Sequence, residues 1–160
     1  MTGPVSRRRV VATLGAGVGG VLAGCLGSGD PEYEDGTVDN VSGGDRTAQQ
    51  MDTASSLAES EPSDQVTPMD VLELVSHEFV FVGGYAGSTV QGIVQNTGDD
   101  RTELAEVRVR VYNDRQELLG LYLASTSNLA AGETWSFQVI ILESPDVIAD
   151  YDIAVLGTPT

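Results

Sequence analysis

From about residue 69 onward, apolar and polar residues alternate in short runs that are separated by Gly, Asn and Asp. Alternation with a period of two is typical of strands with one buried face. The runs are also rich in Val, Leu, Ile, Tyr, Phe and Thr, which favour strands. The predicted strands span residues 71–82, 89–96, 103–113, 117–125, 134–142 and 151–156. No clear helical period lies between them, which favours a two-layer antiparallel sandwich over a parallel sheet.

The run over residues 103–113 has the clearest alternation. Val107, Val109 and Val111 are expected in the core, whereas Glu106, Arg108 and Arg110 are expected to face water. The following run alternates Leu119, Leu121 and Leu123, and the run over residues 134–142 alternates Trp135, Phe137, Val139 and Ile141. An irregularity is expected near Ser76 and His77, where the alternation of the first run shifts phase.

The composition changes ahead of residue 69. Residues 25–68 are mainly Gly, Ser, Thr, Asp, Glu and Gln with scattered Pro. Such a stretch buries too little apolar surface to offset its ordering entropy. A disordered acidic linker is therefore predicted, which would act as an extended spacer ahead of the folded domain. A short, marginal helix is conceivable over residues 47–59, where Ala48, Met51, Ala54 and Leu57 form a thin apolar stripe.

The first residues have the organisation of a signal peptide. Arg7, Arg8 and Arg9 precede an uncharged stretch, residues 10–24, which ends at Cys25. This stretch is rich in Gly and shorter than the roughly twenty apolar residues of a membrane-spanning helix. The domain organisation predicted is therefore a signal peptide over 1–24, a linker over 25–68 and a folded domain over 69–160.

The order Ser6-Arg7-Arg8-Arg9-Val10-Val11 resembles the twin-arginine export motif. That resemblance assigns the export signal to Arg7 and Arg8 and implies export of an already folded protein. Val10 stands where Phe or Leu is common, so the general secretory route is the alternative.

Leu22, Ala23 and Gly24 immediately precede Cys25 and match the lipobox of lipoproteins. Small residues there give a processing enzyme access to the peptide bond, and the Cys25 thiol would receive a diacylglyceryl group. Two acyl chains anchor a protein stably, because each buried methylene contributes about 0.8 kcal/mol. The alternative is an incidental thiol at the end of an ordinary signal or signal-anchor.

Charge narrows the range of partners. The chain has 24 Asp and Glu against 8 basic residues, all of them Arg, and its net charge is -16. Nucleic acid is an unsuitable partner, because binding it requires a basic face. An acidic chain without Lys is similar to proteins of halophilic archaea, with an ordinary acidic protein as the alternative. The single Cys excludes an intramolecular disulfide and a multi-thiolate metal site.

Three stretches together carry a family resemblance. They are Val90-x-Gly92-x-Val94-x-Asn96, then Val107-x-Val109-x-Val111-Tyr112-Asn113-Asp114, then Leu129-x-x-Gly132-Glu133-x-x-x-Phe137. This pattern is similar to the FxLYD-type domain of bacterial and archaeal surface lipoproteins, over about residues 72–156. The resemblance implies an all-β, immunoglobulin-like antiparallel β-sandwich of six to seven strands. Residues 113–116 depart from the usual acidic turn followed by Gly, so this hairpin is expected to differ in shape.

Three residues of this pattern have physical reasons for their positions. Gly92 permits close packing of the sheets, and Asn96 can bond the backbone of the following turn. Gly132 allows a positive φ before Glu133.

No constellation for catalysis, cofactors or metals is recognised. His77 is the only histidine and has no nucleophile motif around it, so a solvated or structural role is favoured. Glu143 with Asp146, or Asp99 and Asp100 with Glu103, could gather around a cation, but no calcium-loop spacing is present. Aromatic residues such as Trp135 are expected to pack in the core rather than to line a recognition face.

The sequence therefore predicts a non-enzymatic protein, lipid-anchored at the extracytoplasmic face of the cell membrane, whose β-sandwich binds a protein or another surface component. The alternative is a solute-capture or accessory lipoprotein of a transporter or surface enzyme. A hydrolase or oxidoreductase is the least favoured class, for want of a nucleophile, metal or cofactor motif.

Overall fold

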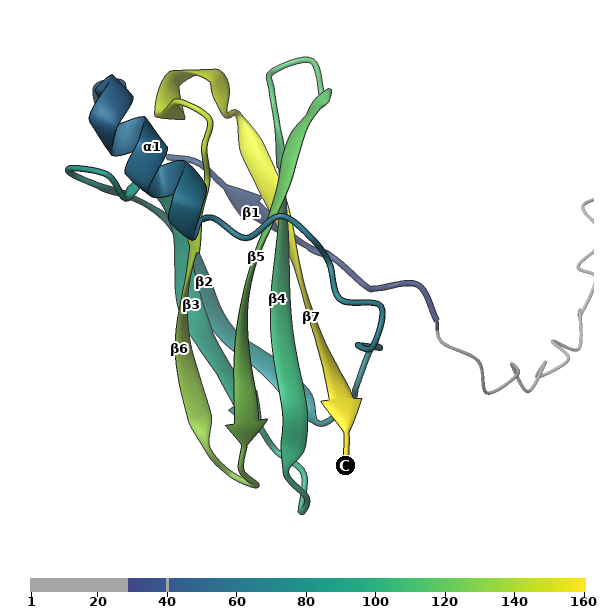
Figure 1. The fold of residues 1–160 in the computed structure, drawn as a ribbon. Coiled ribbons are helices and arrows are strands. Elements are labelled where there is room, and N and C mark those ends of the chain that lie inside the picture. Colours follow the sequence, from purple (N-terminus) through teal and green to yellow (C-terminus); the bar gives the residue numbers. More distant parts are fainter. Residues whose placement is uncertain (1–28, 40) are drawn as a thin grey trace, which may run out of the picture.

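The alternating runs form the strands of a two-layer sandwich in the computed structural model, which describes residues 29–39 and 41–160 (Figure 1). The strands are β1 (Glu34–Thr37), β2 (Leu72–Val82), β3 (Gly87–Asn96), β4 (Thr102–Tyr112), β5 (Leu118–Leu129), β6 (Thr134–Ile140) and β7 (Asp150–Pro159). The described residues also form α1 (Ala48–Leu57) and a 3-10 turn, Pro145–Val147. No helix among them is long and apolar enough to cross a membrane.

The strands form two antiparallel sheets. One has the order β1-β7-β4-β5 and the other the order β2-β3-β6. This is the immunoglobulin-like arrangement, in which the three-stranded sheet β2-β3-β6 faces a second sheet that has β7 and β4 at its centre. The strand next to β7 is β1, from the N-terminal side of the chain. An N-terminal strand therefore occupies the sheet position that the last strand takes in an immunoglobulin domain.

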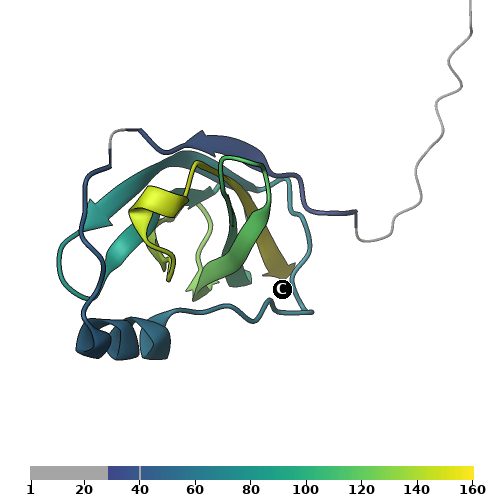
Figure 2. The ribbon, with the colours of Figure 1, turned by 90° about the horizontal axis from the view of Figure 1, so that it is seen from above.

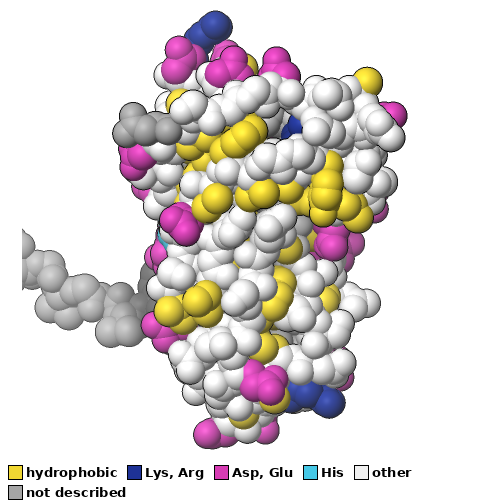
Figure 3. Space-filling view, turned by 90° about the vertical axis from the view of Figure 1, so that its left-hand side faces the viewer, with side chains coloured by type: hydrophobic (Ala, Val, Ile, Leu, Met, Phe, Trp, Pro, Cys, Tyr) yellow, Lys and Arg dark blue, Asp and Glu magenta, His cyan; other side chains and the backbone are white. Residues whose placement is uncertain are grey.

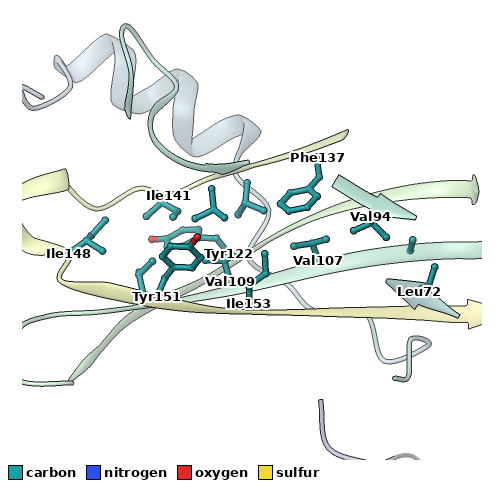
Figure 4. Close-up of a cluster of buried hydrophobic side chains, with 14 of the residues drawn as sticks. Leu72, Val94, Val107, Val109, Tyr122, Phe137, Ile141, Ile148, Tyr151 and Ile153 are labelled. Carbon is teal, nitrogen blue, oxygen red and sulfur yellow. The ribbon is translucent and has the colours of Figure 1, made fainter. Parts of the chain in front are cut away.

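The core lies between the two sheets (Figure 4). Val107, Val109 and Val111 on β4 are fully buried, as the alternation predicts. They face Phe137 and other apolar side chains of β3 and β6, and Tyr151 and Ile153 of β7 complete the packing. Burial of these side chains supplies the main driving force for folding.

The observed strands agree with the predicted runs to within a few residues at most ends. The expected irregularity of the first strand is confirmed, because the register between β2 and β3 shifts between Leu74 and Ser76. The expected roles of Asn96 and Gly132 are also confirmed, and Gly132 has φ +76. Gly92 allows a close approach within one sheet and not between the two sheets, because its β-carbon would collide with the Ser76 carbonyl oxygen of β2 and lie 2.6 Å from the Phe137 ring of β6. Oδ1 of Asn96 accepts a hydrogen bond from the Gly98 amide, 3.0 Å long.

Leu121 and Leu123 of β5 do not lie on the core side, whereas Leu119 packs against the core and Leu129 belongs to it. In the β4–β5 register, Tyr122 is opposite Val109 and faces the core, whereas Leu121 and Leu123 are opposite Arg110 and Arg108. Pairing with β4 decides which β5 side chains face the core and which face outward. Leu121 and Leu123 therefore lie on the outer face of the four-stranded sheet.

Residues 29–39 and 41–68, which we call the strap, run around the outside of the sandwich (Figure 2). β1 pairs with β7, Glu59 bridges to Leu123 of β5, and Thr67 bridges to Gly157 of β7. The predicted disordered linker is thus wrong for these residues. Sheet edges and an outer face with apolar side chains supply partners that the strap lacks on its own.

The marginal helix predicted over residues 47–59 is confirmed as α1. Its first turn has a capping box, because Thr47 and Gln50 each bond the other's backbone amide. Ala54 is fully buried and Ala58 packs against the core. The thin apolar stripe is sufficient because the sandwich supplies the surface on which it packs.

Candidate interaction surfaces

The residues predicted to direct export and lipidation lie outside the described residues. These are Arg7, Arg8, Leu22, Ala23, Gly24 and Cys25. The described residues form two contrasting outer faces, one covered by the strap and one open.

The covered face belongs to the four-stranded sheet, and charged side chains on it bind the backbone of the strap. Glu106 accepts a hydrogen bond from the Ser63 amide, 3.1 Å long, and Arg108 donates to the Ser63 carbonyl oxygen at 2.9 Å. Glu106 and Arg108 are also bonded to each other. The prediction that these side chains face water is therefore wrong for Glu106, which is 2 % exposed, and for Arg108, which is 15 % exposed, whereas a third of the Arg110 side chain still meets water. All three point away from the core as expected, but the strap covers Glu106 and most of Arg108.

A second polar cluster lies along the same face. Arg110 donates two hydrogen bonds to the Asp152 carboxylate, and Tyr112 donates a third to it. The Arg110 guanidinium stacks on the Tyr33 ring of the strap, with its central carbon 3.6 Å from the ring centroid. The hydrogen bond to Asp152 raises the pKa of Arg110, and burial raises the pKa of Tyr33. Glu106, Arg108, Arg110 and Asp152 therefore each have a partner within the chain.

An apolar cluster accompanies these polar contacts. Val66 of the strap packs with Ala154 and Leu156 of β7, and Tyr33 and Leu104 border this group. All three central members are buried. The strap thus gives the outer face of the sheet a small hydrophobic core of its own.

His77 joins three elements. Its Nδ1 lies 2.7 Å from the Tyr151 hydroxyl of β7, and its Nε2 lies 3.8 Å from Glu34 of β1. Burial, followed by the charge of Glu78, raises the pKa of Tyr151 to about 12. The favoured structural role of His77 fits this position, where it links β2 to β7 and to the strap.

Arg46 holds the strap to one end of the sandwich. Its guanidinium donates to the backbone carbonyls of Tyr85, Ala86, Ile141 and Leu142. Nearby, the Tyr122 hydroxyl donates to Glu143 over 2.9 Å, and burial followed by this bond raises the pKa of Tyr122. One side chain therefore binds two loops that are far apart in the sequence.

The acidic residues considered for a cation are not assembled into a site. Across residues 29–39 and 41–160, no group of three or more His, Cys, Asp or Glu side chains is placed to hold a metal ion. Glu143 is engaged with Tyr122, whereas Asp146 is exposed. Trp135 is half-buried and packs against the core beside Phe137, as the alternation predicts.

The open face is the outer surface of β2, β3 and β6. β3 and β6 contain no charged residue, and the only carboxylates on β2 are Glu73 and Glu78. Figure 3 shows this side of the molecule, with carboxylates mainly toward its margins and apolar patches between uncharged side chains. In a chain with 24 acidic residues, this composition distinguishes the face from the rest of the surface.

Comparisons with known proteins find one significant similarity. The chain is 28% identical over 155 residues to an uncharacterized protein of Methanocaldococcus jannaschii, and the alignment covers 94% of this chain and 96% of that protein. The alignment is long enough to include much of the strap as well as the sandwich. No profile of a known protein family matches the chain, and no solved structure matches it significantly.

The strap contacts are the part of the surface that sequence reasoning missed. A signal for them is present in β5, where Leu121 and Leu123 alternate on the side that Arg110 and Arg108 occupy on β4. An outer face with leucines needs a cover. Recognising this required the register between β4 and β5, which the sequence alone does not give.

Proposed function

We propose that this chain is a lipoprotein, exported through a twin-arginine signal and anchored through Cys25 at the extracytoplasmic face of the cell membrane. The observation that carries the proposal is the order Leu22-Ala23-Gly24-Cys25 at the end of an uncharged, Gly-rich stretch that follows Arg7 and Arg8. The exported body is the β-sandwich, which acts as a non-enzymatic binding module in the manner of FxLYD-type domains.

The strap places this module close to its anchor. Glu34, the first residue of β1, is only nine positions after Cys25 in the chain. Even fully extended, nine residues span at most about 30 Å. The sandwich would therefore stand within roughly its own length of the membrane, and not at the end of a long acidic spacer. Such a module is suited to partners in or on the same membrane surface.

Two further features support a binding role. The charges on the covered face are satisfied within the chain, so that face is occupied. The outer face of β2, β3 and β6 has uncharged polar and apolar side chains on β3 and β6 and two carboxylates on β2, and depletion of charge is a feature of protein interfaces.

Substitution of Cys25 by Ser tests the anchor. The full-length variant is expected in the medium, or as an unprocessed precursor without lipid, whereas the wild type remains in the membrane fraction. Ser28→Ala, three residues beyond the lipobox, is the matched control and is expected to behave as the wild type. Mass spectrometry of the mature protein supplies the second measurement. A bare Cys25 thiol with unchanged membrane retention would overturn the proposed anchor.

Affinity capture from native membranes tests the binding role. Retention of surface or secreted proteins supports the module. Capture of a transporter subunit would instead assign the chain to solute capture.

A further inference from the structure

The open face is arranged in rows that run across its three strands. The β2–β3 and β3–β6 registers place Val80, Thr89 and Ile140 in one row and Glu78, Gln91 and Gln138 in the next. The third row is Ser76, Ile93 and Ser136, and the fourth is Glu73, Gln95 and Thr134. Each row therefore has a similar or complementary residue at its two ends.

We propose that this face binds the same face of a second copy of the chain. A twofold axis that runs parallel to the strands and lies between the two faces, directly over β3, would lay β2 of each copy over β6 of the other. Sheets that pack face to face keep their strands nearly aligned, which this axis provides. A twofold interface also makes every contact twice, so self-complementary rows are the required pattern.

The rows pair favourably under this axis. Val80 of one copy meets Ile140 of the other, Ser76 meets Ser136, and Ile93 meets its own copy. Glu78 meets Gln138, and Glu73 meets Thr134, so each carboxylate meets an amide or hydroxyl that can donate a hydrogen bond to it. No carboxylate of the face meets another carboxylate. Two mature chains, each with 24 acidic residues against the 5 Arg that remain without residues 1–24, can therefore approach here without opposing charges of like sign.

The available area fits a dimer that needs its membrane. β2, β3 and β6 have 11, 10 and 7 residues, which at about 3.4 Å per residue and about 4.8 Å between strands give roughly 450 Å² at most on each copy. The pair would bury at most roughly 900 Å², which is at the small end of protein interfaces. Such a dimer is weak in dilute solution. Anchoring both copies in one membrane raises their effective concentration, and in this respect the inference rests on the proposed lipid anchor.

The strap covers only one end of this side of the molecule. There Gly43 lies against Phe81 of β2, Arg46 lies against Gly87 of β3, and Thr89 is fully buried. The contacts of the proposed dimer are therefore made chiefly by the second, third and fourth rows. β1 belongs to the other sheet, and a twofold axis along the membrane normal lets both chains reach the same membrane.

Cysteine cross-linking of the full chain in membranes tests the face and the axis. Ile93→Cys, at the centre of the face, is expected to form a disulfide-linked dimer under mild oxidation. Two differently tagged copies, one with Ser76→Cys and one with Ser136→Cys, are expected to cross-link with each other more than either does with itself. Leu118→Cys, exposed on β5 of the other sheet, is the control and is expected to remain monomeric. Failure of Ile93→Cys to exceed this control would overturn the proposal.

A charge test follows from the pairing of Glu78 with Gln138. Gln138→Glu opposes two carboxylates in each half of the interface and is expected to weaken association about tenfold. The double variant Gln138→Glu with Glu78→Gln restores one carboxylate per contact and is expected to recover association. Gln65→Glu, an equal charge change on the exposed strap, is the control. The disulfide yield of Ile93→Cys in membranes, measured with each of these changes added, compares all three, and equal weakening by Gln138→Glu and Gln65→Glu would contradict the face.

These measurements separate the dimer from the anchor. Cross-linking of Ile93→Cys in a chain that carries no lipid would support the dimer while the anchor fails. A lipid-anchored chain in which Ile93→Cys does not cross-link would support the anchor and overturn the dimer.

Discussion

Tyr151 connects three parts of the fold through a single buried side chain. Its ring belongs to the core, and its hydroxyl is bonded to His77 of β2. The same ring lies against Gly36 of β1, where a β-carbon would collide with it. Gly36 therefore allows the strap to approach β7 at this point, and a larger residue would displace either β1 or the ring.

Removal of the Tyr151 hydroxyl has a predictable pH signature. The folded-state pKa of about 12 lies above the ordinary value near 10, because burial and the charge of Glu78 disfavour the phenolate. The neutral hydroxyl therefore stabilises the fold fully below about pH 10, and this stabilisation is lost as the pH rises from about 10 toward about 12. Tyr151→Phe should lower the free energy of unfolding by about 1 kcal/mol at neutral pH.

The measurement for Tyr151 is urea unfolding between about pH 8 and pH 12. Wild type should lose more stability over the upper part of that range than Tyr151→Phe does. Tyr85→Phe, which changes an exposed ring, should match the wild type throughout. Equal pH dependence in wild type and Tyr151→Phe would contradict the assignment.

At the scale of elements, the strap behaves as an integral strand and helix of the sandwich. β1 completes one edge of the four-stranded sheet, and α1 packs Ala54 at the side of the molecule. Polar side chains hold the strap on both sides of α1. Arg46 binds loops of the sandwich just before the helix, and Glu106 and Arg108 bind the backbone of Ser63 after it. Backbone recognition by charged side chains is stronger than a neutral hydrogen bond.

Replacement of Arg46 tests this description of the strap. Arg46→Ala removes a charged donor from four backbone carbonyls and should lower stability by about 3 kcal/mol. It should also expose residues 29–68 to limited proteolysis before the sandwich unfolds. Arg101→Ala, at an exposed position, should change neither stability nor cleavage. Persistent protection of the strap in Arg46→Ala would show that Arg46 is not what holds it.

At the scale of the whole molecule, charge is distributed unevenly. The net charge is -16, yet the outer surface of β3 and β6 has no charge, and Arg108 and Arg110 are internally paired. The remaining acidic side chains repel one another across the margins and the strap. Salt screens such exposed charges and has less effect on buried pairs.

The thermal stability of the protein should therefore rise with salt. Raising KCl from about 0.1 M to about 1 M shortens the screening length from about 10 Å to about 3 Å and should raise Tm by several degrees. Calorimetry at a fixed protein concentration measures this, with sucrose as the uncharged control. A Tm that is the same at both KCl concentrations would contradict net repulsion as a destabilising term.

Local pattern was sufficient for the sandwich itself. The valines of β4 at alternate positions, the phase shift near Ser76 and the positive φ of Gly132 all depend on side-chain period or backbone sterics. These are properties of a few neighbouring residues, so the sequence contains them directly. The same holds for α1, whose capping residues Thr47 and Gln50 are three positions apart.

The strap and the environment of the β4 charges were decided only in three dimensions. Glu106 alternates out of the core as expected, but its burial depends on Ser63, 43 positions away in the chain. The side of Leu121 and Leu123 was fixed by pairing with β4, and that face required a cover. A polar segment can be ordered by partners that its own composition does not reveal, because the sheet edge and the buried charges supply its hydrogen bonds. The sequence thus determined the six strands from residue 72 onward, whereas the tertiary structure determined β1 and what covers the sheets.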